Sequence, residues 1–400
     1  MKKTKFYSWK STKGKLPKGC RLCAQGRKLV LFVTGICRQK CFFCPISEKK
    51  SGKDFVYANE WKVSSEKDVV EEARLTGAKG AGITGGDPLA RLAKTVRYIR
   101  LLKRKFGRKF HIHLYTPLIL VNLAKLKMLY DSGLDEIRFH PNLDDKKSWQ
   151  KLLLARKFNW SIGVEIPVIP GREKQTKHLV DFIAGDNFDA AHGLVSKTRF
   201  SSPLISEGER KATQAMLGRE RRIGQQRKPL VDFLNLNELE RSDSLVSKLD
   251  IAGFKTKGGQ SYGIKGSEQL AKKILRYAER KGIATHYCTA KLKDKVQLTE
   301  RIKLRARGVA QKFDYITEEG MLVRGAIYTS KNLAKTAQTL HKKLGIPSKY
   351  LVPDSKRKRI LTSAAIVEEF KNELKHLNLK PAIVEEYPTW DAMLVDVQFV

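Results

Sequence analysis

Apolar positions along the first 290 residues alternate between short continuous runs and runs with helical spacing. Short continuous runs indicate buried strands, whereas apolar residues three and four positions apart indicate helices. Strands are predicted at residues 29–34, 81–84, 111–116, 136–140, 161–169 and 230–239. The predicted helices are residues 64–77, 90–105, 120–132, 146–157, 173–184 and 267–281. Such alternation with short connections is typical of an α/β fold, either a parallel sheet or a β/α barrel.

Two segments depart from this alternation. Residues 196–229 are polar and rich in arginine, and we interpret them as a basic helical insertion. The last hundred residues predict a smaller α+β domain, with strands at 320–328, 382–384 and 393–400 and helices at 331–344 and 362–376. We therefore expect a basic N-terminal segment over residues 1–28, a barrel over 29–295 and the α+β domain over 296–400.

Composition excludes several classes of protein. With 400 residues, 41% of them hydrophobic, the chain can bury a large core, which argues against disorder along most of its length. It has no uncharged apolar stretch of the 18 or so residues that a transmembrane helix requires. The lysines and aromatic residues of segment 1–10 do not resemble the apolar region of a secretory signal. We expect a cytoplasmic protein with no membrane partner.

Positive charge is in large excess. The chain carries 79 Lys and Arg against 41 Asp and Glu, a formal net charge of +38. Residues 1–53 hold 15 Lys and Arg and one acid, residues 272–312 hold 13 against three, and residues 356–359 are all basic. Such an excess favours a polyanionic partner, although a general basic bias without a partner is the alternative. Aromatic residues within segment 6–9 suit stacking on unpaired bases, so RNA is the predicted partner.

Three cysteines follow the first predicted strand at a distinctive spacing. Cys37, Cys41 and Cys44 form a Cys-x3-Cys-x2-Cys motif on one short loop. Three thiolates at this spacing can hold three irons of a [4Fe–4S] cluster and leave the fourth iron open for a ligand. A structural zinc loop is the alternative, but zinc would need a fourth ligand nearby. The segment that follows Cys44 supplies no obvious one.

The cysteine motif, with Phe43 just before its third cysteine, resembles the signature of the radical S-adenosylmethionine (radical SAM) superfamily. The resemblance spans about residues 25–290 and implies a partial (β/α)6 barrel with the cluster loop after its first strand. It further implies that S-adenosylmethionine (SAM) chelates the open iron and is cleaved reductively to methionine and a 5′-deoxyadenosyl radical. An electron donor such as ferredoxin or flavodoxin is the implied partner.

Two further segments fit the same resemblance. Gly85, Gly86, Asp87 and Pro88 end the second strand where the family has Gly-Gly-Glu-Pro, whose backbone meets the methionyl amino group. Asp87 departs from the usual Glu, which leaves the backbone role available. The segment around Ile166 looks like the fifth-strand segment of the pyruvate formate-lyase activating enzyme branch, which lies near the adenosine. A plain turn and a buried strand are the respective alternatives.

Polar residues near the carboxyl ends of two strands are candidates for ligand binding. His140 ends the fourth strand, and Asn235 and Asn237 alternate along the sixth. In β/α barrels the carboxyl ends of the strands face the active site, so these side chains can bond a cofactor or substrate. Helix capping and local turn bonding by Asn and His are the alternative.

The remaining cysteines suggest a second metal site. Cys20 and Cys23 precede the first strand, and His286 and Cys288 follow the last barrel helix. Because the first and last strands of an open barrel can be neighbours, the two pairs could converge into a Cys3His set. Such a set binds zinc tetrahedrally, with an auxiliary Fe–S cluster as the competing occupant. Free cysteines beside an ordinary histidine are the alternative.

Three functions are compatible with these observations. Segments 233–240, 286–289 and 293–298 resemble an uncharacterised archaeal group related to pyruvate formate-lyase activating enzyme, which supplies no substrate. The charge favours a radical SAM enzyme that modifies tRNA or rRNA. The family branch favours instead an activase that generates a radical on a protein or peptide partner. A non-enzymatic, zinc-dependent RNA-binding module would require the cysteine motif to hold zinc.

Overall fold

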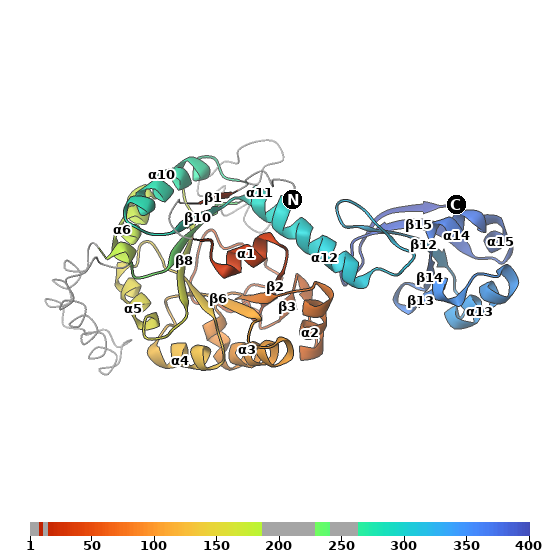
Figure 1. The fold of residues 1–400 in the computed structure, drawn as a ribbon, viewed down its shortest axis with the longest axis horizontal. Coiled ribbons are helices and arrows are strands. Elements are labelled where there is room, and N and C mark those ends of the chain that lie inside the picture. The colour runs from red at the N-terminus through yellow and green to blue at the C-terminus, as the bar shows by residue number, and fades with distance from the viewer. Residues whose placement is uncertain (1–7, 11–14, 186–228, 241–262) are drawn as a thin grey trace. The chain divides into compact units, whose positions relative to one another are not determined.

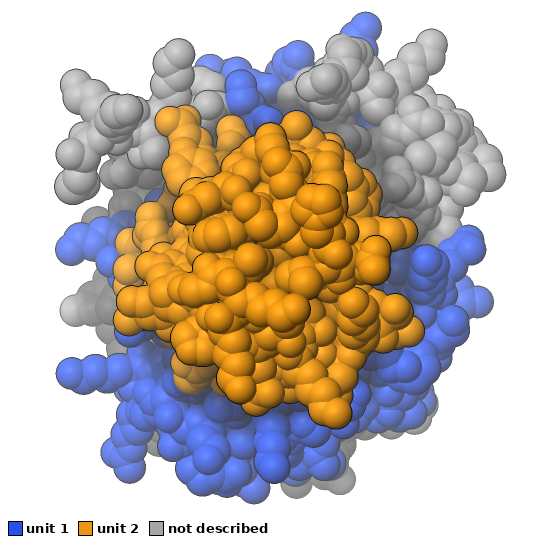
Figure 2. All heavy atoms as spheres, turned by 90° about the vertical axis from the view of Figure 1, so that its right-hand side faces the viewer, with its two compact units in different colours: residues 1–24, 28–70, 79–295 blue, residues 25–27, 71–78, 296–400 orange. Residues whose placement is uncertain are grey.

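A computed structural model describes residues 8–10, 15–185, 229–240 and 263–400. The chain divides into two compact units, coloured separately in Figure 2. Unit 1 comprises residues 1–24, 28–70 and 79–295, and unit 2 comprises residues 25–27, 71–78 and 296–400. The basic insertion predicted at residues 196–229 lies, apart from its last residue, outside the described residues.

Unit 1 is built on one ten-stranded sheet in the order β1, β10, β9, β8, β7, β6, β5, β2, β3, β4 (Figure 1). Seven of its described strands are parallel. These are β2 (Lys28–Phe32), β5 (Gly80–Thr84), β6 (His111–Pro117), β7 (Glu136–His140), β8 (Ser161–Val168), β9 (Phe233–Glu238) and β10 (Thr285–Cys288). Antiparallel strands flank them, namely β1 (Ser8–Lys10) beside β10, and β3 (Tyr57–Ala58) and β4 (Trp61–Lys62) beside β2.

Helices surround this sheet in the order expected of a β/α barrel (Figure 1). They are α2 (Glu66–Leu75), α3 (Leu92–Phe106), α4 (Leu123–Asp131), α5 (Leu152–Ala155), α6 (Glu173–Ala184) and α10 (Ser267–Arg280). Short helical turns η1 (Pro88–Arg91), η2 (Lys146–Lys151), α11 (Ala290–Leu292) and η3 (Lys293–Leu298) complete the connections. The predicted partial barrel is confirmed, and β10, which the apolar pattern did not predict, extends it by one strand.

Strand register sorts the side chains of the barrel into two faces. His113 pairs with Glu136, Tyr115 with Arg138, and Glu165 with Asn235. Residues in register share a face of the sheet, so one face is polar. The residues between them, such as Leu114 and Ile137, are fully buried and belong to the hydrophobic core. The barrel therefore has apolar packing on its helix side and a polar interior.

A short N-terminal helix, α1 (Lys18–Ala24), packs against β2, β5 and β6. Its Gly19 lies so near the interior that a Cβ there would come within 2.6 Å of His113 Nδ1 and 2.5 Å of an Arg138 nitrogen. The Gly19 N–H donates to Glu136 across 117 residues of sequence. Glycine is therefore the residue that lets α1 approach the barrel interior this closely.

Unit 2 is an α+β structure with an antiparallel sheet in the order β13, β14, β12, β15, β16, and with β11 beside β12. The strands are β11 (Tyr315–Ile316), β12 (Leu322–Tyr328), β13 (Val352–Asp354), β14 (Arg359–Thr362), β15 (Lys380–Glu386) and β16 (Leu394–Phe399). Its helices are α12 (Thr299–Val309), α13 (Leu333–Leu344), α14 (Ala364–Glu369) and α15 (Lys371–His376), with turns η4 (Ser348–Tyr350) and η5 (Ser355–Arg357). Ile327, Leu340, Ile360 and Val367 form its buried core.

Not every residue of the basic run 356–359 lies at the surface of unit 2. Arg359 is 1% exposed, so it is not available to a polyanionic partner. Its guanidinium donates to both carboxylate oxygens of Glu386 at 2.7 and 2.8 Å, and to Asp354 at 2.9 Å. A buried cation is stable only when carboxylates compensate it, and Arg359 is compensated within the sheet.

Among the helices that the structure describes, none has the length and apolar character needed to cross a lipid bilayer.

Candidate active site

The carboxyl ends of the barrel strands surround a cavity of about 380 Å³. The loop after β2 supplies one wall, and β5 to β9 supply the others. Predicted site residues that line it are Cys37, Cys41, Cys44, Gly85, Gly86, His140 and Asn237. Further lining residues are Gln39, Phe43, Thr84, Tyr115, Thr116, Glu165, Pro167, Glu238, Glu240 and Lys293. The structure therefore brings the cysteine motif and the strand-end polar residues to one cavity.

The three cysteines of the loop fit an iron–sulfur cluster better than a single ion. Among the described residues, no group of three or more His, Cys, Asp or Glu side chains is arranged to hold one metal ion. Three thiols around one cavity suit a multi-iron cluster, in which each thiolate binds its own iron. Gln39 donates its backbone N–H to Cys37 Sγ at 3.3 Å and its side-chain amide to Cys41 Sγ at 3.2 Å. Burial raises the pKa of Cys41 to about 11, so a bound cation is needed to keep that sulfur ionised.

The two glycines of the next turn are required by close backbone approach. Gly86 donates its N–H to Thr34 O at 2.7 Å, and Asp87 donates to Ile36 O at 2.8 Å. Gly85 has φ +151°, and a Cβ on Gly86 would lie 2.5 Å from Ile36 O. No other residue fits at Gly86 without displacing the cysteine loop. The turn and the cysteine loop are therefore held together as one rigid wall.

The Asp87 side chain has a structural role behind the cavity, whereas Gly85 and Gly86 line the cavity. Its Oδ1 accepts from Leu89 N at 3.0 Å and from the Thr116 hydroxyl at 2.8 Å. Asp87 is fully buried, and burial raises the pKa of its carboxyl. Neither Asp87 nor Pro88 lines the cavity. The predicted turn thus contributes main chain to the cavity, and the Asp87 side chain caps η1 behind it.

Glu165 lies at the floor of the cavity and is held by three side chains. Its Oε2 accepts from Arg138 at 2.9 Å and from Asn235 at 2.8 Å, and its Oε1 accepts from Asn237 at 2.8 Å. Burial would raise the pKa of this carboxyl, but the Arg138 charge and the two amide donors outweigh burial and lower it. Glu165 is therefore an ionised, fixed acceptor at the cavity floor.

His140 is fixed in one tautomer beside Glu165. Its Nδ1 lies 2.8 Å from the backbone oxygen of Glu165, and burial lowers the pKa of the imidazole. Because a carbonyl only accepts, the neutral ring carries its proton on Nδ1, which leaves Nε2 as an acceptor. The Phe43 ring contacts it at a centroid distance of 5.7 Å. By contrast, Ile166 is buried between the lining residues Glu165 and Pro167 and does not line the cavity.

Comparison with known proteins matches both parts of the chain. A family model described as the radical SAM superfamily matches residues 31–183, and one described as a domain of unknown function (DUF8061) matches residues 320–398. A relative from Methanocaldococcus jannaschii is 34% identical over 398 residues, covering 96% of this chain and 92% of its own length. The chain belongs to the radical SAM superfamily. It is therefore an enzyme of this superfamily, whose cofactors are a [4Fe–4S] cluster and SAM.

The comparisons also give the names of individual proteins that this chain is similar to. The M. jannaschii protein carries the provisional name of a glycyl-radical enzyme activating enzyme. The radical SAM methyltransferase TsrM from Kitasatospora setae, solved with tryptophan and a SAM analogue, is 11% identical, with 75% of this chain and 55% of TsrM covered and a TM-score of 0.35. Coproporphyrinogen III oxidase from Escherichia coli is 13% identical, with coverages of 91% and 94% and a TM-score of 0.28.

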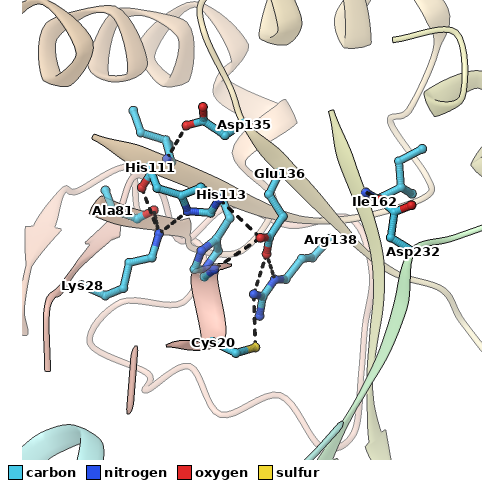
Figure 3. A network of polar contacts seen from close by, with 12 residues as sticks. Cys20, Lys28, Ala81, His111, His113, Asp135, Glu136, Arg138, Ile162 and Asp232 are labelled. Carbon is cyan, nitrogen blue, oxygen red and sulfur yellow. Dashed lines mark hydrogen bonds and ion pairs between the residues drawn. The ribbon is translucent and has the colours of Figure 1, made fainter. Parts of the chain in front are cut away.

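The radical SAM barrel is filled with a buried ionic network at the other end of its strands (Figure 3). Arg138 donates to Glu136 Oε1 at 2.6 Å and to Cys20 Sγ at 3.3 Å. Lys28 Nζ donates to His111 Nδ1 at 3.0 Å and to the backbone oxygens of Ala81 and His111 at 2.9 Å. Arg138 also binds Glu165, so the network continues from helix α1 to the floor of the cavity.

The residues predicted for a second metal lie on neighbouring elements of the same barrel. Cys20 and Cys23 are one turn apart on α1, and His286 and Cys288 are buried on β10. Burial raises the pKa of Cys288 to about 12, and the nearby Cys20 and Cys23 contribute to the rise. As stated above, no described group is arranged for a single ion. The second metal site stays a prediction.

Two charged residues of this radical SAM site were not predicted from the sequence. Both lie within predicted strands: Glu165 lines the floor of the cavity, and Arg138 binds it from the interior of the barrel. A signal was available, because polar residues alternate along β6, β7 and β8 as they do along β9. Such period-two polar residues in a barrel whose outer face is covered by helices point to the interior.

Proposed function

We propose that this radical SAM enzyme is an activase that generates a glycyl radical on a partner protein. The observation that carries the proposal is the relative named as a glycyl-radical enzyme activating enzyme, whose similarity extends over 96% of this chain. The RNA substrate predicted from the charge has no support from the comparisons. The non-enzymatic zinc module is excluded because the chain belongs to an enzyme superfamily.

The size of the cavity supports a macromolecular substrate. Its volume is about 380 Å³, near the lower end of the roughly 300–1,000 Å³ typical of small-molecule sites. SAM bound beside the cysteine loop would share that space with the reacting part of the substrate. The bulk of the substrate then stays outside, and only a short segment reaches the reacting atoms. A glycine on an exposed loop suits this geometry because it has no side chain to exclude.

In the proposed reaction Cys37, Cys41 and Cys44 would hold the cluster, and the main chain of Gly85 and Gly86 would bind the methionyl group of SAM. With one electron from a donor, the two cofactors would supply the radical chemistry that removes a hydrogen atom from the substrate carbon. The products are 5′-deoxyadenosine, methionine and the substrate radical.

The polar residues of the floor orient the ligand and do not exchange protons. Glu165 accepts hydrogen bonds as a carboxylate because Arg138 and the amides of Asn235 and Asn237 keep it ionised. His140 accepts through Nε2, since Nδ1 is occupied by the Glu165 carbonyl. Both groups therefore suit hydroxyl or amino donors on the ligand.

The test follows the hydrogen atom. Cells that lack this enzyme are grown on glycine deuterated at its α-carbon, and their protein and RNA fractions are incubated anaerobically with reconstituted enzyme, SAM and dithionite. We expect singly deuterated 5′-deoxyadenosine from the protein fraction, because abstraction from a glycyl residue moves one deuterium to the nucleoside. Ribonuclease treatment should leave this transfer unchanged.

Two other labelling results would contradict the proposed glycyl substrate. Deuterium transfer that disappears with ribonuclease, or substrate-dependent turnover confined to the RNA fraction, would favour RNA modification. Release of unlabelled 5′-deoxyadenosine from every labelled protein fraction would exclude a glycyl substrate. Enzyme lacking Cys37, Cys41 and Cys44 is the control for background cleavage of SAM.

A further inference from the structure

The cysteine loop of unit 1 has an inner and an outer side. Residues 37, 39, 41 and 43 line the cavity, whereas the residues between them do not. Arg38, Lys40 and Phe42 are exposed, Phe42 by 37% of its surface. We call these three residues the outer wall. The loop is thin here, because Cys37 lines the cavity and is also exposed.

The outer wall belongs to a loop with an excess of positive charge. The Gly35 N–H donates to Lys53 O at 2.7 Å, which closes the loop and places the exposed Lys53 near its start. Lys49 is exposed as well, and Glu48 is the one acid between residues 36 and 53. The next acid, Asp54, is already bound by Arg91 at 2.9 Å and Lys94 at 2.7 Å. The loop therefore offers a cationic surface with one exposed aromatic ring.

We propose that the outer wall is the docking surface for an acidic one-electron donor protein. The cluster must receive one electron for each cleavage of SAM. The donor loses that electron and the cluster gains it, so the two changes balance. Transfer needs a short path, and Arg38 and Lys40 each adjoin a cluster cysteine in the chain. Positive side chains around an apolar contact suit a partner of opposite charge and favour fast association.

The position of the wall favours an electron donor over a substrate. Arg38, Lys40 and Phe42 do not line the cavity, so a macromolecule held only by them is separated from the reacting atoms by the loop itself. An electron can cross this wall, whereas a hydrogen atom must be taken by direct contact. The inference rests on the radical SAM chemistry and is independent of whether the substrate is a protein or an RNA.

Charge reversal with a matched control tests the proposal. Arg38→Glu/Lys40→Glu changes the outer wall, and Arg104→Glu/Lys105→Glu makes the same change at exposed positions near the end of α3. Helix α3 ends just before β6 begins, so the control pair lies at the opposite end of the barrel. The probe is an acidic [2Fe–2S] ferredoxin, added to the cluster-loaded enzyme under anaerobic conditions. Its affinity and its rate of cluster reduction are measured at several salt concentrations.

We expect the outer-wall variant to bind ferredoxin about tenfold or more weakly, with slower cluster reduction and a shallower salt dependence, because rim charges act mainly on association. The control pair should stay within about twofold of the wild type. Reduction by dithionite should be equal in all three proteins, because that small reductant needs no docking surface. Unchanged iron content establishes that the cluster is intact.

Three results would overturn the proposal. Equal losses in both double variants would assign the attraction to the overall charge, and no loss in either would place the donor elsewhere. Unchanged ferredoxin binding with weaker binding of a single-stranded RNA would make the wall a nucleic-acid surface. If the charge-reversed protein loses iron, Arg38→Gln/Lys40→Gln replaces it, and an affinity equal to the wild type then counts against the proposal.

Discussion

The two ends of the barrel use the same strands in opposite ways. At the amino ends, Lys28, Glu136 and Arg138 are 3%, 1% and 2% exposed and are bonded to one another or to main-chain oxygens through short contacts. At the carboxyl ends, the strands surround a cavity of about 380 Å³ lined by thiols, amides and carboxylates. One end is closed by the chain itself, and the other is left for ligands.

The two ends differ in whether the chain itself supplies hydrogen-bond partners for their polar side chains. Helix α1 supplies Gly19 and Cys20 to the closed end, where they bond Glu136 and Arg138. No equivalent helix enters the open end among the described residues, and the cysteine loop forms a wall there instead of a plug. Substitutions at the closed end should therefore affect stability, and substitutions at the open end should affect chemistry.

The largest expected effect is at the open end. Replacing Cys37, Cys41 and Cys44 together with Ala should abolish release of 5′-deoxyadenosine, because the cluster loses all its protein ligands. The melting temperature of the metal-free protein should change little, since these side chains hold no buried network. Product is measured by mass spectrometry under anaerobic conditions. A variant that still cleaves SAM would refute the ligand assignment, and zinc or residual iron in it would support the second metal site.

The largest stability effect is expected at the closed end. Arg138→Met leaves the carboxylates of Glu136 and Glu165 without their shared cation, and breaking a buried pair in this way costs about 3–5 kcal/mol. Urea unfolding of the metal-free protein measures the loss. The control is Arg172→Met, which removes an exposed pair with Asp144 and should cost about 0–1 kcal/mol. Equal effects of the two substitutions would contradict the distinction between the ends.

The free energy of unfolding should depend on pH through Lys28 at the closed end. Burial lowers the pKa of Lys28 from 10.5 to about 7. Between these values the unfolded chain binds a proton at this position that the folded chain has released, so raising the pH stabilises the fold. Lys28→Met should remove this contribution, which amounts to at most about 1.4 kcal/mol per pH unit. Unfolding at pH values from 7 to 10 measures it, with the exposed Lys79→Met as control. Parallel pH profiles for wild type and Lys28→Met would refute it.

The smallest expected effect is at the hydrogen bond between the lining residue Thr116 and the buried Asp87. Thr116→Val removes the hydroxyl that donates to Asp87 at 2.8 Å and should cost about 1 kcal/mol of stability. Because Asp87 directly follows Gly85 and Gly86 and caps η1 after them, the affinity for SAM should fall a few-fold while the iron content stays constant. Equilibrium binding of SAM measures the change. Thr116→Ser, which retains the donor, should behave as the wild type.

The sequence predicted the barrel well because its signal is local. Apolar runs such as residues 29–34 and 136–140 match β2 and β7 closely, and Cys37 to Cys44 identify the cluster loop by spacing alone. Strand β10 was missed because its residues Thr285 to Cys288 include only two of clear apolar character. It is held by pairing with β9 and β1, and neither contact is local in sequence.

The floor of the cavity could be predicted only in part. Asn235, Asn237 and His140 were found because they lie at strand ends, whereas Glu165 was overlooked beside the neighbouring Ile166. The alternation of polar residues along β8 assigns Glu165 to the interior, but it does not show which side chains bind the carboxylate there. The structure decides it through the bonds of Glu165 to Arg138 and the two amides.

The docking of α1 has a consequence for the order in which the protein forms. Gly19 and Cys20 bond partners that lie 117 and 118 residues later, and β1 pairs with β10 through Ser8 and Cys288. On the ribosome these early residues emerge long before their partners exist. Contacts so distant in sequence form late, because a long loop must close first. A segment that precedes its partners by more than 100 residues is therefore among the last to dock, and its docking completes the closed end of the barrel.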